Sequence, residues 1–302
     1  MITLPNSLMT LQPATAARFR AALDAVLPYS ERAVLELAMR HLRAAQEREV
    51  CPLPTHATEF ERAVVNFADQ FAVSVSSLEH AQVDALISLS NSAAVSALAN
   101  AIYLIDAGLR LQLVVPSVLP PEACEGDLPT SQDAAPEPEP AADDSETVIA
   151  GAIAEFAAAA VLASDIDPLT SELVRLRCAQ IHNCRLCGSL RQRSALESGL
   201  EANVASRVAN YESGGFSDAQ VAALRLCDTM IMHPSDANAA LSEELAAFYS
   251  PTQIAEICFD VVKWSQQKAL VALGSDAAPW EGIHILDFDG DGHPVFAGPV
   301  AA

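Results

Sequence analysis

The sequence predicts an all-α protein, and three observations support this fold class. Hydrophobic residues make up 51% of the 302 residues but aromatic residues only 5%, and such a composition suits closely packed helices better than a β-sandwich. Apolar side chains recur every three to five positions between residues 169 and 181, as on one buried face of a helix. Helix-start signals also occur, such as Ser250 followed by Pro251 ahead of an apolar-periodic segment.

Residues 117–146 are rich in proline and acidic residues and poor in apolar ones. Such a segment buries too little apolar surface to offset the entropy of ordering it, so we predict an extended linker. The linker separates a helical region at 1–116 from a second helical region at 147–283, and a tail at 284–302 follows.

The two helical regions are predicted to be tandem repeats. Residues 63–69 align with residues 222–228 at a shift of 159 positions, and the alignment continues without a gap. The steps between matched apolar residues are mostly three or four or multiples of them, which is the period of buried helix faces. The matched pairs are Leu86 with Leu245, Val95 with Ile254, Leu98 with Ile257, Ile102 with Val261, and Leu111 with Leu270.

The tail is predicted to form two short strands joined by a glycine-rich turn. Asp287, Asp289 and Asp291 imitate the opening of a calcium-binding EF-hand loop. The acid expected at the twelfth position of such a loop would be Gly298, so a hairpin without calcium is the preferred interpretation.

Cys184 and Cys187 are the place where residue type and spacing together suggest chemistry. Asp167 and Pro168 begin a predicted helix, Asn183 is expected to break it, and a new helix is expected from about Cys184 toward residues 198–199. The sulfurs of a CxxC pair can meet across one helical turn and cycle between dithiol and disulfide. The first repeat has a single cysteine, Cys51, so we predict one active and one degenerate repeat.

Other interpretations of this segment remain open. Two buried cysteines can serve only as small apolar side chains in a core. A zinc site would use Cys178 and His182 on one helix face with Cys184 and Cys187, but four ligands within ten residues are crowded for structural zinc, so no metal is predicted. No organic cofactor is predicted either, because there is no glycine-rich phosphate loop beside a strand.

Charge and composition limit the partners and the compartment. The net charge of −22 repels phosphate backbones, so nucleic acid is not an expected partner. The N-terminus lacks the features of a signal peptide, and the apolar run at 149–163 is too short to span a bilayer. Seven cysteines at irregular spacing do not suggest a secreted disulfide framework, so we expect a cytoplasmic protein without a membrane partner.

The segment from Glu172 to Cys187, ELVRLRCAQIHNCRLC, resembles the signature of the alkylhydroperoxidase D-like (AhpD-like) superfamily, which also contains carboxymuconolactone decarboxylases. The resemblance covers residues 150–275 well and 60–113 weakly. It implies an AhpD-like helical bundle that forms homo-oligomers and reduces peroxides with an external thiol reductant. By the same resemblance, Cys187 would attack the peroxide, Cys184 would resolve the sulfenic acid, and Glu172 would handle protons.

One position departs from the family pattern. The family places a histidine four residues after the second cysteine, where this chain has Arg191. Arginine stays charged and cannot relay protons, although it can favour a thiolate by Coulomb attraction, and His182 is a candidate replacement base. Helix electrostatics alone would favour Cys184 as the thiolate, whereas the resemblance favours Cys187.

The sequence therefore predicts a thiol-dependent peroxidase that reduces a small-molecule peroxide. A catalytically degenerate interaction scaffold is the alternative, since a fold does not determine a function. Decarboxylation of a lactone acid is a third function, which the CxxC pair disfavours because decarboxylase members do not rely on one.

Overall fold

The computed structural model describes residues 2–26, 32–119, 145–201 and 203–300, and within them the protein is mostly helical. Most of the predicted linker lies outside the described residues; α6 runs to Val118 and α7 begins at Ser145. Before the linker the helices are α1 (Asn6–Leu11), α2 (Pro13–Val26), α3 (Arg32–Glu47), α4 (Glu59–Val73), α5 (His80–Leu89) and α6 (Ser92–Val118). After it follow α7 (Ser145–Leu162), α8 (Pro168–Ile181), α9 (Arg185–Gly188), α10 (Arg193–Glu197), α11 (Ala205–Ala209), α12 (Asp218–Met232), α13 (Ala239–Ala246), α14 (Pro251–Trp264) and α15 (Gln267–Ala272).

The predicted helix starts are confirmed by their caps. The Asp167 carboxylate accepts the backbone N–H of Thr170 at 3.0 Å ahead of Pro168. Ser250 forms a capping box with Gln253 at the start of α14, with Pro251 at the first helical position. These bonds satisfy N–H groups that have no partner inside the helix.

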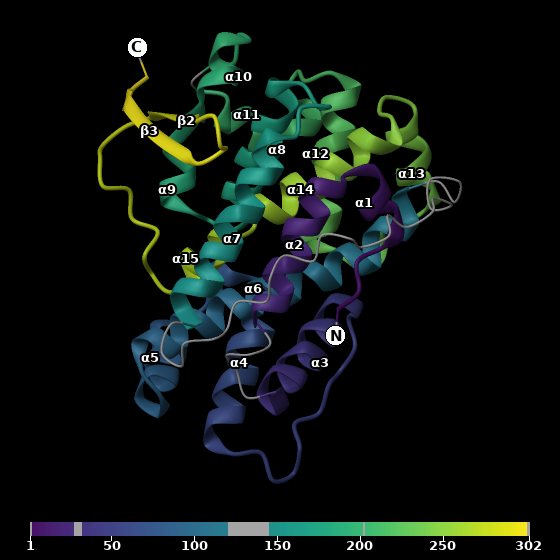
Figure 1. The fold of residues 1–302 in the computed structure, drawn as a ribbon. Coiled ribbons are helices and arrows are strands. Elements are labelled where there is room, and N and C mark those ends of the chain that lie inside the picture. The colour runs from purple at the N-terminus through teal and green to yellow at the C-terminus, as the bar shows by residue number, and fades with distance from the viewer. Residues whose placement is uncertain (1, 27–31, 120–144, 202, 301–302) are drawn as a thin grey trace.

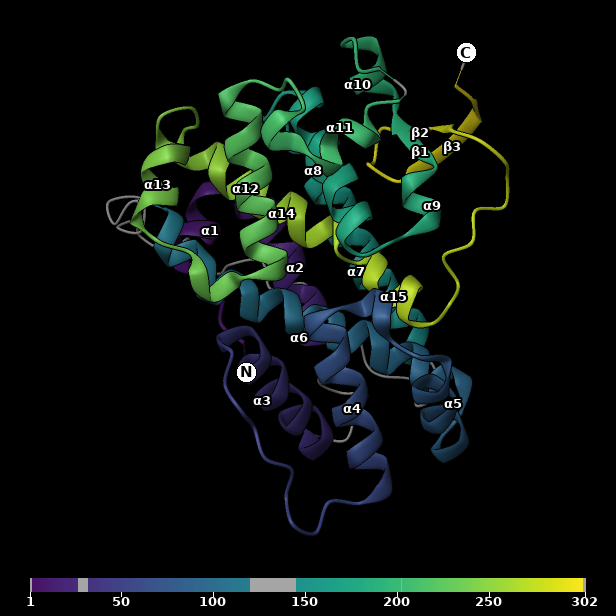
Figure 2. The same ribbon diagram turned by 180° about the vertical axis from the view of Figure 1, so that it is seen from behind.

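Both halves of the chain contribute to one hydrophobic core. α2 packs against α7, and Figures 1 and 2 show these two helices beside α6 in the middle of the molecule, with α3, α4 and α5 at one end. The rings of Phe19, Phe156 and Phe259, from α2, α7 and α14, meet with centroids 4.9 to 6.3 Å apart. The same cluster of buried residues includes side chains from both predicted repeats.

α6 is long and apolar enough to cross a bilayer, and it is the one helix of the described residues that passes this test. In the protein 72% of its most apolar window is buried against other helices. Core helices of this kind are apolar around their whole circumference, which accounts for the composition.

A small sheet lies beside the cysteine-bearing segment (Figure 2). β2 (His284–Phe288) pairs antiparallel with β3 (Pro294–Pro299), as expected for the predicted hairpin. β1 (Leu190–Gln192) adds a third strand, parallel to β2. The expected helix from Cys184 to residues 198–199 is therefore wrong: α9 ends at Gly188, and strand pairing separates it from α10.

The aspartates of the tail are used in local contacts. The Asp289 carboxylate accepts the backbone N–H groups of Asp291 at 3.0 Å and His293 at 2.9 Å. Asp287 forms an ion pair with Arg193. No group of three or more metal-ligating side chains is found in the described part of the chain.

Candidate functional site

The cysteine pair lies in a tight turn between α8 and α9. Asn183 has a positive φ of 54°, a conformation that asparagine tolerates better than most residues, and this ends α8 as the sequence predicts. Cys184 then occupies the N-cap position of α9, where its sulfur accepts the backbone N–H of Cys187 at 3.3 Å.

The two sulfurs lie 2.7 Å apart. Cys184 is buried and Cys187 is half-buried. The hydrogen bond between the two sulfurs lowers the pKa of Cys184, and the same bond together with burial raises the pKa of Cys187. In the dithiol state the negative charge is therefore favoured on Cys184 and the proton on Cys187, as the helix electrostatics predicts.

Arg175 connects Glu172 to the cysteine turn. Its guanidinium binds both Glu172 carboxylate oxygens at 2.6 and 2.7 Å, and both side chains are fully buried. It also donates to the backbone carbonyls of Cys187 at 2.8 Å and Leu190 at 2.6 Å. Arg175 is thus a cation that acts on both sulfurs, and it lowers the pKa of Cys184.

Arg175 was missed by the sequence reasoning, although Glu172 and Arg175 are spaced for an ion pair on one helix face. Glu172 also accepts the backbone N–H of Gln192 at 3.3 Å. The carboxylate predicted to handle protons is therefore engaged by a bidentate arginine.

Arg191 is buried beside the turn. Its guanidinium donates to the backbone carbonyls of Gly188 at 2.9 Å and Leu190 at 2.6 Å. Burial, followed by the like charge of Arg175, lowers the pKa of Arg191. Arg191 therefore braces the segment between Cys187 and β1.

His182 belongs to a different group of residues. Its Nε2 lies 3.1 Å from the Ser265 hydroxyl, and burial followed by the positive charges of Lys268 and Arg110 holds its pKa well below the usual range. The structure thus gathers Cys184, Cys187, Glu172 and Arg191 around the turn, whereas His182 joins a network centred on Asp106.

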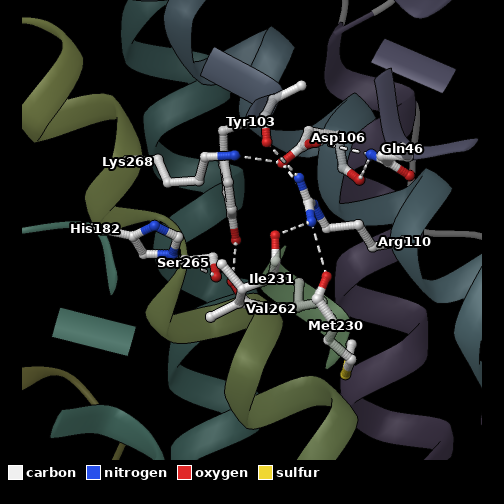
Figure 3. A network of polar contacts seen from close by, with 11 residues as sticks. Gln46, Tyr103, Asp106, Arg110, His182, Met230, Ile231, Val262, Ser265 and Lys268 are labelled. Carbon is white, nitrogen blue, oxygen red and sulfur yellow. Dashed lines mark hydrogen bonds and ion pairs between the residues drawn. The ribbon is translucent and has the colours of Figure 1, made fainter. Parts of the chain in front are cut away.

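That network is shown in Figure 3. The Asp106 carboxylate accepts Arg110 at 3.0 Å, Lys268 at 2.7 Å and Gln46 at 2.7 Å. Burial acts to raise the pKa of Asp106, but Arg110 and Lys268 outweigh it and lower the value to about 2. Burial lowers the pKa of Lys268 to about 8.

The segment between α15 and β2 forms hydrogen bonds with the cysteine turn. The Asp276 carboxylate accepts the backbone N–H of Arg185 at 2.9 Å, and its carbonyl accepts that of Leu186 at 2.9 Å. The Trp280 indole donates to the Ser189 hydroxyl at 3.0 Å. Sequence reasoning missed Asp276, because its partner Arg185 lies 91 residues earlier in the chain.

The zinc interpretation is not supported by the positions of the sulfurs. Cys178 lies 3.6 Å from Cys227 on α12, so its nearest sulfur partner is outside the CxxC motif. Trp264 is a packing residue: the Lys263 ammonium lies 3.3 Å from the centroid of its ring, and the Arg175 guanidinium lies 5.6 Å from it.

A buried carboxylate on α14 gives a prediction about stability. The Glu256 carboxylate accepts the backbone N–H groups of Asp165 at 2.8 Å and Ile166 at 3.3 Å, and burial raises its pKa to about 7. The unfolded chain loses this proton near pH 4.3, so Glu256 destabilises the fold progressively as the pH rises from about 4 to 7. Over this interval the stability of Glu256→Gln should improve relative to the natural protein.

The measurement is urea unfolding of both proteins at several pH values. Glu155→Gln, at a half-exposed position of α7, is the control and should show no such trend. A constant difference between Glu256→Gln and the natural protein from pH 4 to 7 would contradict the prediction.

Comparisons with known proteins give relatives without a described activity. Over 113 residues the chain is 37% identical to two uncharacterized proteins of Mycobacterium tuberculosis, MT2376 of strain CDC 1551 and Rv2313c of strain H37Rv. The match covers 37% of this chain and 40% of each relative, so the chain spans about two fifths of the curated relatives it matches. No family model matches, and no solved structure matches.

Proposed function

We propose that this protein is a thiol-dependent peroxidase that reduces a hydroperoxide with the Cys184–Cys187 dithiol. The observation that carries the proposal is the 2.7 Å separation of the two sulfurs in a turn fixed by Arg175 and Asp276. Two thiols held this close can pass from dithiol to disulfide with little movement of the backbone. The half-buried Cys187 is the sulfur that solvent reaches more easily, which supports its assignment as the attacking residue.

The Cys184 thiolate acts as the general base, because the Arg191 guanidinium cannot accept a proton. As Cys187 attacks the peroxide, its proton passes to Cys184, 2.7 Å away. The peroxide O–O bond breaks, Cys187 becomes a sulfenic acid, and the alcohol leaves with the proton from Cys184. Cys184 is then again a thiolate, ready for the second step.

In the second step the Cys184 thiolate attacks the Cys187 sulfur. The S–O bond breaks and hydroxide leaves, taking up a proton to form water, and a Cys184–Cys187 disulfide remains. Two electrons have passed from the dithiol to the peroxide. Two equivalents of an external thiol restore the dithiol by exchange, so an external reductant is part of the proposal.

An AhpD-like tandem repeat is part of the same proposal, and the order of helices supports it. α4, α5 and α6 begin at residues 59, 80 and 92, and α12, α13 and α14 begin 159 residues later in each case. Four of the five matched apolar pairs are buried in both halves; Leu270, the partner of Leu111, is 37% exposed. At a different shift, of 134 positions, α3 contains the sequence LRAAQ at 42–46 and α8 contains LRCAQ at 176–180, which supports α3 as a counterpart of α8 without the cysteines.

The packing of the repeats resembles that of a symmetric dimer. The Tyr103 hydroxyl donates to the carbonyl of Val262 at 3.0 Å, and these two positions are equivalent at the shift of 159. In a two-fold interface a residue that contacts its own equivalent lies on the axis. The fused repeats therefore supply within one chain a contact that single-repeat proteins would make between subunits. Further homo-oligomer formation and a cytoplasmic location without membrane or nucleic-acid partners remain part of the proposal.

The test is the loss of thiols from the reduced protein under dilute hydroperoxide. We expect two thiols to be lost per peroxide, with a Cys184–Cys187 disulfide found by mass spectrometry. Neither Cys184→Ser nor Cys187→Ser should form this disulfide. Cys184→Ser should regain reaction at Cys187 as the pH is raised, because hydroxide then removes the proton that Cys184 no longer accepts.

Cys187→Ser should not regain the reaction at any pH, which separates the attacking sulfur from the base. If thiol loss in the natural protein is no faster than for free cysteine and is unchanged in both variants, the peroxidase proposal fails. The interaction scaffold would then be the better account of this fold.

A further inference from the structure

A second pair of cysteines joins α8 to α12. The sulfurs of Cys178 and Cys227 lie 3.6 Å apart, and both side chains are fully buried. Their neighbours in the chain, Arg177 and Asp228, form a bidentate ion pair at 2.6 and 2.9 Å. Tyr211 also donates to Asp228 at 3.0 Å. The two helices are thus held together next to the sulfurs by the contacts of Asp228.

Burial alone would not distinguish these residues, because free cysteine is commonly found in protein cores. Cys258 on α14 is just as buried and serves as an example of that ordinary role. What distinguishes Cys178 and Cys227 is that their sulfurs face each other across a helix interface. The sulfurs would need to approach by about 1.5 Å to reach the length of a disulfide bond.

We propose that Cys178 and Cys227 form a second redox pair, which a hydroperoxide converts to a disulfide between α8 and α12. One thiolate attacks the peroxide, the O–O bond breaks, an alcohol or water leaves, and the sulfur becomes a sulfenic acid. The second sulfur attacks the first, the S–O bond breaks, and water leaves. One peroxide gains two electrons and the two thiols lose two. This reaction does not depend on the Cys184–Cys187 pair.

The pair should react slowly at neutral pH. Burial, together with the hydrogen bond between the two thiols, raises the pKa of Cys227 well above its usual range. The thiolate is the reactive species, so the rate should rise about tenfold for each pH unit from 7 to 9. Because its oxidation is slow, the Cys178–Cys227 pair should become a disulfide only when the protein is exposed to peroxide for a long time.

The disulfide would fasten the helix that carries the CxxC turn to the rest of the second half. It closes a loop between residues 49 positions apart. A cross-link of this span restricts the unfolded chain, so oxidation should raise the melting temperature by about 5 °C.

The test uses the Cys184→Ser/Cys187→Ser double variant, so that only the second pair can respond. The folded, reduced variant is treated with hydrogen peroxide at pH 7, 8 and 9, denatured with iodoacetamide present, and digested with trypsin without reduction. Cleavage after the flanking basic residues gives peptides 178–185 and 226–263. We expect these two peptides to be cross-linked, with Cys258, which lies in the second of them, carrying one alkyl group.

Cys178→Ala in the same background is the matched control. It should give no cross-link, leave Cys227 open to alkylation, and show no rise in melting temperature on oxidation. The proposal is overturned if Cys227 is fully alkylated after oxidation of a protein that remains folded. It is also overturned if the cross-link forms only when denaturant is added before the peroxide. Neither result bears on peroxide reduction by the CxxC pair.

Discussion

Replacing Asp106 by asparagine is expected to lower the free energy of unfolding by about 3–5 kcal/mol, the usual cost of breaking a buried ion pair. Asp106 is the carboxylate that binds both Arg110 and Lys268, and all three side chains are buried. Asparagine keeps the shape of the side chain but removes its negative charge, so Arg110 and Lys268 would remain in the core without a counter-ion. Urea unfolding at pH 7 measures the loss.

A double-mutant cycle separates the ion pair from other effects of the substitution. Lys268→Met removes one cation, and the combination with Asp106→Asn should cost less than the sum of the two single changes. Asp84→Asn, at an exposed position of α5, should change stability by less than about 0.5 kcal/mol. If Asp106→Asn costs less than about 1 kcal/mol, the network does not stabilise the fold as argued.

The pH dependence of this network has two opposite parts. The pKa of Asp106 is about 2 in the folded protein and about 3.9 in an unfolded chain. Its contribution is therefore full above about pH 4 and is lost as the pH falls toward 2. The pKa of Lys268 is about 8, against about 10.4 unfolded, so its burial penalty is relieved as the pH rises from 8 to 10.

Removing the buried charges of Glu172 and Arg175 together is expected to slow the reaction of the cysteine pair at pH 7 several-fold, because the thiolate is the reactive form of cysteine. Arg175 lowers the pKa of Cys184 and fixes the carbonyl of Cys187. In Glu172→Gln/Arg175→Met both charges are absent, so no uncompensated buried ion destabilises the fold. The alkylation rate with iodoacetamide, measured against pH, should show a thiolate that forms at higher pH than in the natural protein.

Arg185→Met is the matched control for this experiment. Arg185 also lies at the start of α9, but its side chain is 62% exposed and its charge is screened by solvent. Its loss should change the alkylation rate by less than the loss of Arg175 does. An unchanged pH profile in Glu172→Gln/Arg175→Met would show that Arg175 does not stabilise the thiolate.

The helices, their starts and the break at Asn183 could be predicted because each depends on neighbours in the chain. Asp167 caps α8 through a residue three positions away, and Ser250 caps α14 in the same way. The C-terminal strands could also be predicted, since their pairing requires only a short turn. Local chemistry was sufficient in all these cases.

The parts that could not be predicted depend on distant partners. β1 is a strand because Leu190 and Gln192 pair with His284 and Leu286, about 94 residues further along the chain. His182 was expected near the cysteines, but its ring lies 3.1 Å from the hydroxyl of Ser265 at the C-terminal end of α14. The turn between α8 and α9 directs successive side chains to different partners. Such an irregular turn has no hydrophobic period in the sequence, so these directions could not be predicted.

Arg110 has a consequence for how the two halves unfold. Its guanidinium donates to the carbonyl of Ala72 near the end of α4 and to those of Met230 and Ile231 near the end of α12. One side chain on α6 thus closes the last turn of a helix in each half. Melting of either half would remove hydrogen bonds that Arg110 makes, so we expect the two halves to unfold together.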